Sequence, residues 1–280
     1  MKIAVVGMGS IGQRHFNNLI SFKKRYDIKN ICAYENNQDR IKKLKKKFKN
    51  HLITNDFKKV VSGSDVVYIC SPTNIHIQSI KNVLKYAQPH FYIEKPLSSK
   101  IHNCRSTLIK LEKIRKKVAV GYMLRNHPVI KFTKNILNKK TLGKVLFARA
   151  ESGFYLPFWH PWEDYRDFYM SSASKGVGAL LDTSHEINYL QYFFGKAEKV
   201  SAKIQTISEL EISSDDLTTA SIYFKNKVHA QVHLDLLQFD EERFFKIIGS
   251  KAVLIGDLKK NVVKIFDLKN KKWKFTNLNF

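Results

Sequence analysis

The chain has 280 residues, of which 44% are hydrophobic, and it carries a formal net charge of +25. This length and apolar content suit one or two globular domains with a buried core and exclude a disordered chain. The basic residues are 40 Lys and only 9 Arg, whereas proteins that read nucleic acid rely on Arg for bidentate contacts. We therefore interpret the charge as a lysine-rich solvated surface and expect no nucleic acid among the partners.

No apolar stretch reaches the roughly 20 residues that a membrane-spanning helix needs. The N-terminus also lacks the charged, apolar and small-residue order of a signal peptide. The cysteines are Cys32, Cys70 and Cys104, an odd set without a CxxC pair. We therefore expect a soluble, cytoplasmic protein without a membrane partner, a disulfide framework or a cysteine zinc site.

The first 120 residues alternate short apolar runs with helical patterns. The runs are rich in Val, Ile and Tyr and mostly lack polar alternation, which is typical of strands buried on both faces of a parallel sheet. The sequence therefore predicts a doubly wound parallel sheet over residues 1–121. The predicted strands are 2–7, 30–35, 65–70, 90–95 and 117–122, and the predicted helices are 11–21, 37–48, 74–87 and 99–115.

The pattern changes in the second half of the chain. Runs with strand character follow one another with short turns between them, as expected for antiparallel neighbours. We expect a second domain over residues 122–280, of the α+β class with a mostly antiparallel sheet. Its elements are helices at 127–138 and 179–194, strands at 144–152, 198–207, 217–224, 228–236, 243–249, 252–256 and 262–267, and an aromatic-rich loop at 153–170.

The segment VVGMGSIG places Gly7, Gly9 and Gly12 in a G-x-G-x-x-G spacing. Such a spacing occurs by chance, but here it follows a predicted strand and opens a helix at the start of a βαβ unit. Gly7 permits a tight turn, Gly9 lets the backbone approach a pyrophosphate, and Gly12 lets helix and strand pack closely. N–H groups at the start of this helix, including those of Ser10 and Ile11, can then hold phosphates.

Glu35 ends the second predicted strand. An acid at this place accepts hydrogen bonds from the adenosine ribose and repels a 2′-phosphate. We therefore expect NAD as the cofactor, with NADP less favoured. The alternative is a structural glycine turn with a surface glutamate.

Residues 70–76, CSPTNIH, leave the same predicted sheet edge as Glu94 and Lys95. Ligands of open α/β sheets bind beyond the carboxyl ends of the strands, so we expect both segments to contact the cofactor. Asn74 is expected to cap the next helix, and His76 is either a ligand or a helix-surface histidine. The expected contacts from this turn are Ser71, Pro72, Thr73, Asn74 and His76.

Four segments occur in order along the chain: GMGSIGQRH, CSPTNIH, EKPLS and GALLDTSHEINYLQYFFG. Together they resemble the glucose-fructose oxidoreductase/inositol dehydrogenase (Gfo/Idh/MocA) family over residues 1–195, and IIGSKAVLIGD at 247–257 extends the likeness. The resemblance implies a Rossmann domain followed by an α+β domain with an open, mainly antiparallel sheet. In the family, the face of this sheet often makes the contact of a homodimer or homotetramer.

The resemblance also implies catalytic residues. Lys95 of the E-K-P motif would lie between nicotinamide and substrate, with Pro96 fixing the turn, often through a cis bond, and Glu94 orienting the lysine. His185 would be the general acid/base, since the pKa of histidine lies near working pH. Asp182, three residues earlier on the same predicted helix start, would orient the imidazole or bind a sugar hydroxyl. A solvated lysine and a core histidine held by an aspartate are the structural alternatives.

The aromatic loop is the expected specificity element. Tyr155 and Trp162 can stack on a sugar ring or a base, and Arg166 can bind a carboxylate or phosphate. Arg125 is expected near the nicotinamide. An oligomer interface would explain the aromatic residues equally well. The acids and histidine of the loop fit no metal motif, so we expect no metal site.

The resemblance as a whole implies an NAD-dependent oxidoreductase that acts on a CH–OH group of a sugar. An amino sugar or nucleotide sugar of glycan biosynthesis is the first expectation, and an inositol or polyol dehydrogenase or a non-catalytic dinucleotide-binding protein are the alternatives. Three features depart from the family pattern. Gly176-Val177-Gly178 stands where the family commonly has three glycines. Asn188 stands where Asp is common, and the second domain ends at Phe280, which suggests a shortened C-terminus.

Overall fold

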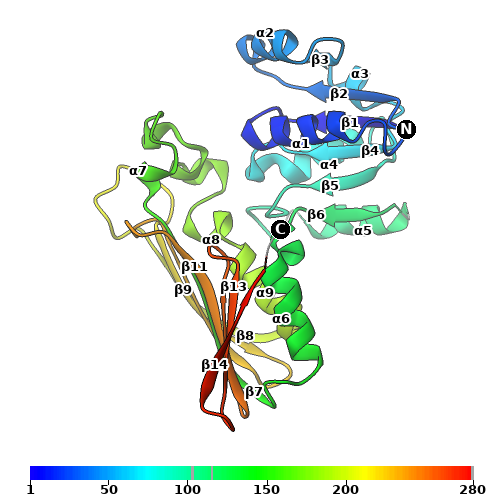
Figure 1. Cartoon of the computed structure of the whole chain (residues 1–280). Coiled ribbons are helices and arrows are strands. Elements are labelled where there is room, and N and C mark those ends of the chain that lie inside the picture. Colours follow the sequence, from blue (N-terminus) through cyan, green and yellow to red (C-terminus); the bar gives the residue numbers. More distant parts are fainter. Residues whose placement is uncertain (102–103, 115, 279–280) are drawn as a thin grey trace. The chain divides into compact units, whose positions relative to one another are not determined.

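The computed structural model describes residues 1–101, 104–114 and 116–278. The chain divides into two compact units, Met1–Gly121 and Tyr122–Phe280 (Figure 1). Within the described ranges, no helix has the length and apolar character needed to cross a membrane.

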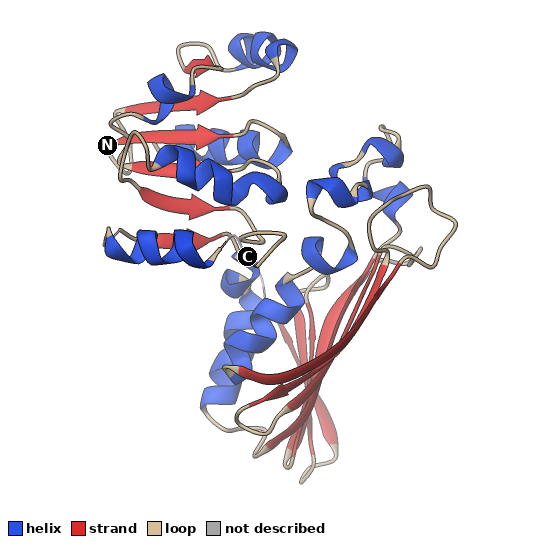
Figure 2. Cartoon of the chain, turned by 180° about the vertical axis from the view of Figure 1, so that it is seen from behind, coloured by secondary structure: helices blue, strands red, loops and turns tan. Residues whose placement is uncertain are grey.

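The first unit is a parallel sheet with helices packed on both faces (Figure 2). In chain order it contains β1 (Lys2–Val6), α1 (Ser10–Ser21), β2 (Asn30–Tyr34), α2 (Gln38–Lys47), β3 (Leu52–Thr54), α3 (Phe57–Val61), β4 (Val66–Ile69), η1 (Thr73–Ile75), α4 (His76–Val83), β5 (His90–Ile93), α5 (Arg105–Lys113) and β6 (Val118–Val120). The strand order is β3-β2-β1-β4-β5-β6, with parallel neighbours. The order reverses between β1 and β4, and such a switch point is where open α/β sheets bind ligands.

The central strand β1 shows why the sequence lacks polar alternation. Ile3 and Val5 pack on one face with residues of α1 and α2, and Ala4 and Val6 pack on the other with residues of α3, α4 and α5. Both faces are therefore covered, and every position of the strand favours an apolar side chain. The predicted doubly wound sheet is confirmed.

Four local elements of this unit differ from the prediction. The helix α3 (Phe57–Val61) was not predicted. The short edge strand β3 was not predicted, because three residues carry too little pattern to separate a strand from a loop. The helix expected from residue 74 begins as the 3-10 turn η1, and Pro72 rather than Asn74 precedes it. The helix expected at 99–115 begins only at Arg105, and residues 102, 103 and 115 lie outside the described residues.

The second unit is built on an eight-stranded sheet in the order β14-β13-β12-β11-β7-β10-β9-β8. Strands β7 and β10 pair in parallel, and the other neighbours are antiparallel. Its elements are η2 (Met123–Asn126), α6 (Pro128–Asn138), β7 (Val145–Gly153), α7 (Leu156–Trp159), η3 (Tyr165–Asp167), η4 (Tyr169–Ser171), η5 (Ala173–Lys175), α8 (Ala179–Asp182), α9 (His185–Phe194), β8 (Ala197–Gln205), β9 (Leu217–Phe224), β10 (His229–Asp235), β11 (Glu242–Gly249), β12 (Ala252–Asp257), β13 (Val262–Asp267) and β14 (Lys272–Asn277). The expectation of a mainly antiparallel sheet is confirmed.

The helices α6 and α9 pack on one face of this sheet (Figure 1). Ile130 of α6 and Phe193 of α9 share one core with Phe245 and Ile247 of β11. Because side chains alternate along a strand, Phe244 and Lys246 of β11 point to the opposite face.

The helix predicted at 179–194 is two helices, α8 and α9, with a break at Thr183 and Ser184. The Thr183 hydroxyl donates to the Ala179 carbonyl, and the Ser184 hydroxyl donates to the Leu181 carbonyl at 2.9 Å. Serine and threonine that bond backward in this way compete with the helical hydrogen bonds and bend or interrupt a helix.

Phe245 lies in the hydrophobic core of the second unit, and its substitution tests this core. It is fully buried, with its centroid 5.4 Å from that of Tyr189 and 5.5 Å from that of Phe193. We expect Phe245→Ala to lower the free energy of unfolding by about 3–5 kcal/mol. Leu268, in the turn after β13, is 59% exposed, so Leu268→Ala should change the free energy of unfolding by less than about 1 kcal/mol. Denaturant unfolding followed by circular dichroism measures both, and equal losses would contradict this assignment of the core.

Candidate functional site

The glycine turn after β1 packs tightly against the turn after β4. Gly7 has a φ of +93°, and a Cβ atom there would lie 2.7 Å from the Ser71 nitrogen. A Cβ atom on Gly12 would lie 2.0 Å from the Gly7 carbonyl oxygen. Neither position can hold a larger residue, because its Cβ atom would clash with the backbone of the protein itself.

Gly9 differs from its two neighbours. A Cβ atom on Gly9 would meet nothing within 4 Å, and its φ of −65° suits any residue. Gly9 is the N-cap of α1, whose first turn carries Ser10, Ile11 and Gly12. N–H groups of a first turn lack partners within the helix, so open backbone beside them fits the pyrophosphate of a dinucleotide.

Glu35 follows β2 as predicted, but its carboxylate is already engaged. It is 3% exposed, and Oε1 accepts from the backbone N–H groups of Asn36 and Asn37, both at 3.0 Å. Oε2 accepts from the Met8 N–H at 3.1 Å and from Nη1 of Arg40 at 3.2 Å. Since a carboxylate has about four acceptor positions, a ribose hydroxyl would have to replace one of these donors. The ribose contact of Glu35 stays a prediction.

The turn after β4 and the E-K-P segment leave the same sheet edge. Ile69 and Ile93 are register partners at the ends of β4 and β5, so the residues that follow start side by side. Thr73 is buried, and Asn74 lies inside η1. Of the predicted contact residues of this edge, Ser71 lies against the glycine turn, with its nitrogen 2.7 Å from the Cβ position of Gly7.

His76 is not the helix-surface histidine that one alternative assumed. It is 1% exposed and begins α4. Its Nδ1 lies 3.0 Å from the Pro96 carbonyl oxygen, and its Nε2 lies 2.7 Å from the Ser71 carbonyl oxygen. Both ring nitrogens therefore face the protein backbone, which leaves the expected cofactor contact of His76 without support from this geometry.

Glu94 is held by a histidine that the sequence analysis did not single out. Its Oε1 lies 2.7 Å from Nε2 of His15, on α1, and its Oε2 accepts from the backbone N–H of Lys95 at 3.2 Å. A Cβ atom on Gly121 would lie 3.1 Å from Glu94 Oε1. His15 is the last residue of the GMGSIGQRH segment, three residues after Gly12, which is the signal that could have pointed to it. The Lys95–Pro96 bond is cis, as the resemblance implied.

In the second unit, Asp182 and His185 flank the break between α8 and α9. The prediction that both lie on one helix start is therefore wrong in detail. His185 is buried, and its ring meets that of Tyr122 edge-on at 5.5 Å.

The residue after His185 is a buried acid in an ion pair. Glu186 is fully buried and accepts from Nε of Arg243 at 2.8 Å and from Nη2 at 3.1 Å. Burial acts to lower the pKa of Arg243, but Glu186 outweighs it and raises that pKa above its usual value. This bidentate pair ties the first turn of α9 to β11, and no sequence pattern had indicated it.

The expected substrate residues have protein partners. Nε of Arg125 donates to Asn188 at 2.7 Å, and Tyr155 packs edge-on against Phe158 and Phe239. Trp162 is 74% exposed and stacks on His160. Among the described residues, no cluster of three or more His, Cys, Asp or Glu could hold a metal ion.

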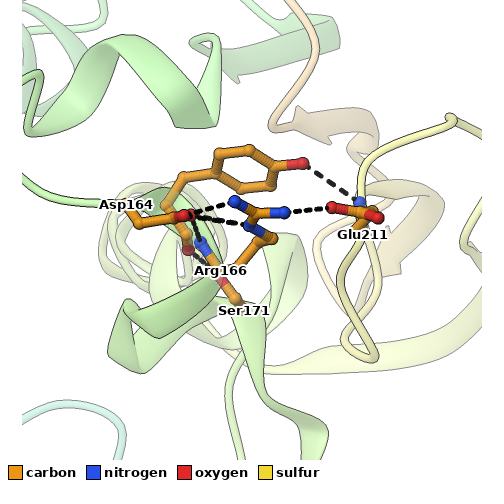
Figure 3. Close-up of polar contacts among 5 residues, drawn as sticks. Asp164, Arg166, Ser171 and Glu211 are labelled. Atoms are coloured by element: carbon orange, nitrogen blue, oxygen red, sulfur yellow. Dashed lines mark hydrogen bonds and ion pairs between the residues drawn. The ribbon is translucent and has the colours of Figure 1, made fainter.

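Arg166 lies between two carboxylates (Figure 3). Its Nε donates to Asp164 Oδ1 at 2.9 Å and its Nη2 to Oδ2 at 2.5 Å, while Nη1 donates to Glu211 at 2.7 Å. The hydrogen bonds from Arg166 lower the pKa of the Asp164 carboxyl to about 2. To bind a substrate anion, Arg166 would have to exchange one of these partners.

Comparison with known proteins identifies the class. Residues 1–122 match the oxidoreductase family with the NAD-binding Rossmann fold, and residues 130–255 match the GFO/IDH/MocA C-terminal domain. The chain belongs to the GFO/IDH/MocA family, and its first unit is the NAD-binding domain of that family.

Individual relatives are distant. The uncharacterized oxidoreductase YrbE of Bacillus subtilis is 27% identical over 237 residues, which cover 81% of this chain and 65% of that protein. The myo-inositol 2-dehydrogenase of Thermotoga maritima is 26% identical over 266 residues, 92% of this chain and 75% of that one. The structure of the UDP-N-acetylglucosamine 3-dehydrogenase GnnA from Acidithiobacillus ferrooxidans superposes with a TM-score of 0.79 at 16% identity, covering 100% of this chain and 83% of that one. The chain thus spans about two thirds of the length of YrbE.

The fit of the glycine turn to a pyrophosphate predicts opposite behaviour for two glycines. Gly9→Ala should lower the melting temperature only slightly, through the poorer helix N-cap, but weaken NADH binding at least about tenfold, because the methyl group meets only the ligand. Gly12→Ala should lower the melting temperature, because the methyl group meets the Gly7 carbonyl. Calorimetric titration and thermal unfolding measure the two effects. Undiminished NADH affinity in Gly9→Ala would contradict the fit.

Proposed function

We propose that the chain transfers hydride between nicotinamide and a secondary alcohol or ketone of a sugar. The observation that carries the proposal is that Lys95 follows β5 at the carboxyl edge of the parallel sheet. The last residues of β5 and β4, Ile93 and Ile69, are register partners, and the turn after β4 packs on Gly7. An ammonium group at this edge lies where ligands of such sheets bind. The family membership supports the cofactor, since its N-terminal domain binds NAD.

The proposed roles follow from the chemistry of the side chains. Gly9 and the first turn of α1 hold the pyrophosphate, and bound NAD supplies the carbon that accepts or donates the hydride. Lys95 hydrogen-bonds the developing alkoxide, which is electrostatic stabilisation of the transition state. His185 takes the hydroxyl proton as general base, and Asp182 orients the imidazole or binds a sugar hydroxyl.

The proposed substrate is an amino sugar or a nucleotide sugar. The exposed indole of Trp162 and the ring of Tyr155 offer surfaces on which a sugar ring or a base can stack. Arg125 and Arg166 supply positive charge to an anionic substrate. The likeness to a UDP-N-acetylglucosamine dehydrogenase adds support at the level of the fold. A free inositol or polyol is the second candidate, favoured by the relative that is a myo-inositol 2-dehydrogenase.

The test combines binding with turnover. NADH and NADPH are titrated by calorimetry, and NAD is then offered with UDP-N-acetylglucosamine or with myo-inositol while NADH absorbance is followed. We expect tighter binding of NADH and turnover of the nucleotide sugar. Lys95→Met and His185→Asn should each lower kcat by about 10²-fold or more, whereas Lys59→Met, an exposed lysine on α3, should not.

The other outcomes separate the alternatives. Turnover of myo-inositol but not of the nucleotide sugar would favour an inositol or polyol dehydrogenase. NADH binding that Lys95→Met leaves intact, without turnover of any sugar, would favour a non-catalytic dinucleotide-binding protein. Failure to bind either cofactor would overturn the proposal.

We further propose a homo-oligomer built on the second sheet, with the face opposite α6 and α9 as its contact. This face carries Phe266 and Trp273, whose rings lie 5.3 Å apart on β13 and β14, and Phe275, which is 65% exposed. A hollow of about 700 Å³ lined by Arg149 and Lys203, among others, lies on the same sheet. Open apolar side chains of this extent favour association with a second copy.

Substitution of the exposed rings tests this interface. Trp273→Lys combined with Phe275→Lys should convert the oligomer to a smaller species in light scattering coupled to gel filtration, because lysine places like charges across the contact. Tyr26→Lys, which replaces an exposed ring of the first unit, should leave the mass unchanged. A wild-type monomer at micromolar concentration would contradict the proposal.

A further inference from the structure

We propose that His76 is a positioning residue that fixes the backbone beside Lys95 to the turn after β4. This inference rests on the proposed role of Lys95. The imidazole of His76 contacts the E-K-P segment, which carries Lys95, and also the turn after β4, which packs on the glycine turn.

The geometry of the ring is the first argument. Nδ1 reaches the carbonyl oxygen of Pro96 at 3.0 Å, and Nε2 reaches that of Ser71 at 2.7 Å, with the side chain 1% exposed. Ser71 is the residue whose nitrogen lies 2.7 Å from the Cβ position of Gly7. One rigid ring therefore connects the E-K-P segment, through Ser71, to the turn that would hold the pyrophosphate.

The position of the bonds along the chain is the second argument. Pro96 directly follows Lys95, and its carbonyl is one of the two groups that the ring contacts. Glu94 directly precedes Lys95 and is paired with His15 at 2.7 Å. After Lys95, His76 of α4 contacts the backbone carbonyl of Pro96. Before Lys95, His15 of α1 pairs with the Glu94 carboxylate, whose other oxygen accepts from the Lys95 backbone N–H. A lysine side chain has four rotatable bonds, so fixing its backbone limits the volume that its ammonium samples.

Histidine suits this position because its two nitrogens point in different directions on one rigid ring. A neutral imidazole donates one N–H, whereas the imidazolium can donate to both carbonyls. Burial lowers the pKa of His76, while the Ser71 and Pro96 carbonyls and the Glu94 carboxylate favour the protonated ring. Asparagine and glutamine carry both N–H donors on one nitrogen, so they cannot place a nitrogen at the positions of both ring nitrogens.

The test reads the position of Lys95 without needing a substrate. Limited acetylation with acetic anhydride, followed by peptide mass spectrometry, gives the modification rate of Lys95 with and without NADH. In the wild type, NADH should slow the acetylation of Lys95. In His76→Ala, NADH should still bind, but its protection of Lys95 should fall about fivefold, as for the loss of one buried hydrogen bond. His76→Gln should lie between the two.

His51 provides the matched control. Its Nδ1 also lies near a backbone carbonyl, that of Ile31 at 3.2 Å, but it precedes β3 at the amino end of the sheet. His51→Gln should leave the protection of Lys95 unchanged. Melting temperatures of all variants are measured, and if His76→Ala does not fold, His76→Gln carries the test.

The outcomes distinguish the inference from the proposed function. If NADH does not protect Lys95 in the wild type, the role of Lys95 fails and the inference with it. If NADH protects Lys95 equally in wild type and in both folded His76 variants, the role of Lys95 stands and the inference is overturned. Equal loss of protection in His51→Gln would also overturn it, since the effect would then be general to the sheet.

Discussion

The close approach of two turns, one after β1 and one after β4, is the constraint on which the first unit's site depends. Gly7 and Gly12 have no room for a Cβ atom because the Ser71 nitrogen and the Gly7 carbonyl lie where it would go. This contact brings the start of α1 against the sheet and leaves the backbone at Gly9 open. The strand order that reverses at β1 and β4 makes such a meeting possible.

The polar groups near this contact have partners from other elements. The Glu94 carboxylate pairs with His15, and the His76 ring lies against the Pro96 and Ser71 carbonyls. Within the second unit, the Glu186 carboxylate is likewise paired with Arg243. Each of these groups is largely removed from water, and a buried polar group that lacked a partner would cost stability. The same bonds that satisfy the burial requirement therefore also limit where the candidate catalytic residues can move.

Glu35 and Arg166 illustrate how such bonds compete with ligand binding. Glu35 stands at the end of β2, where an acid selects the ribose of NAD, yet Arg40 and three N–H groups already occupy its oxygens. Arg166, which could bind an anionic substrate, is shared between Asp164 and Glu211. Binding at either residue would be an exchange of partners, so its net free energy is smaller than that of a new ion pair.

The sequence by itself determined the fold class, the glycine turn and the edge that carries Lys95, because these depend on local patterns: apolar runs, glycine spacing and the order of strands. It did not reveal the strand β3, the break at Thr183 and Ser184, or the pairing of Glu186 with Arg243. These depend on contacts between residues far apart in the chain or on hydroxyl groups that bond backward within a turn. His76 shows the difference most clearly. Its place at a helix start was readable, but only the tertiary structure decided that both its nitrogens face carbonyls of other segments.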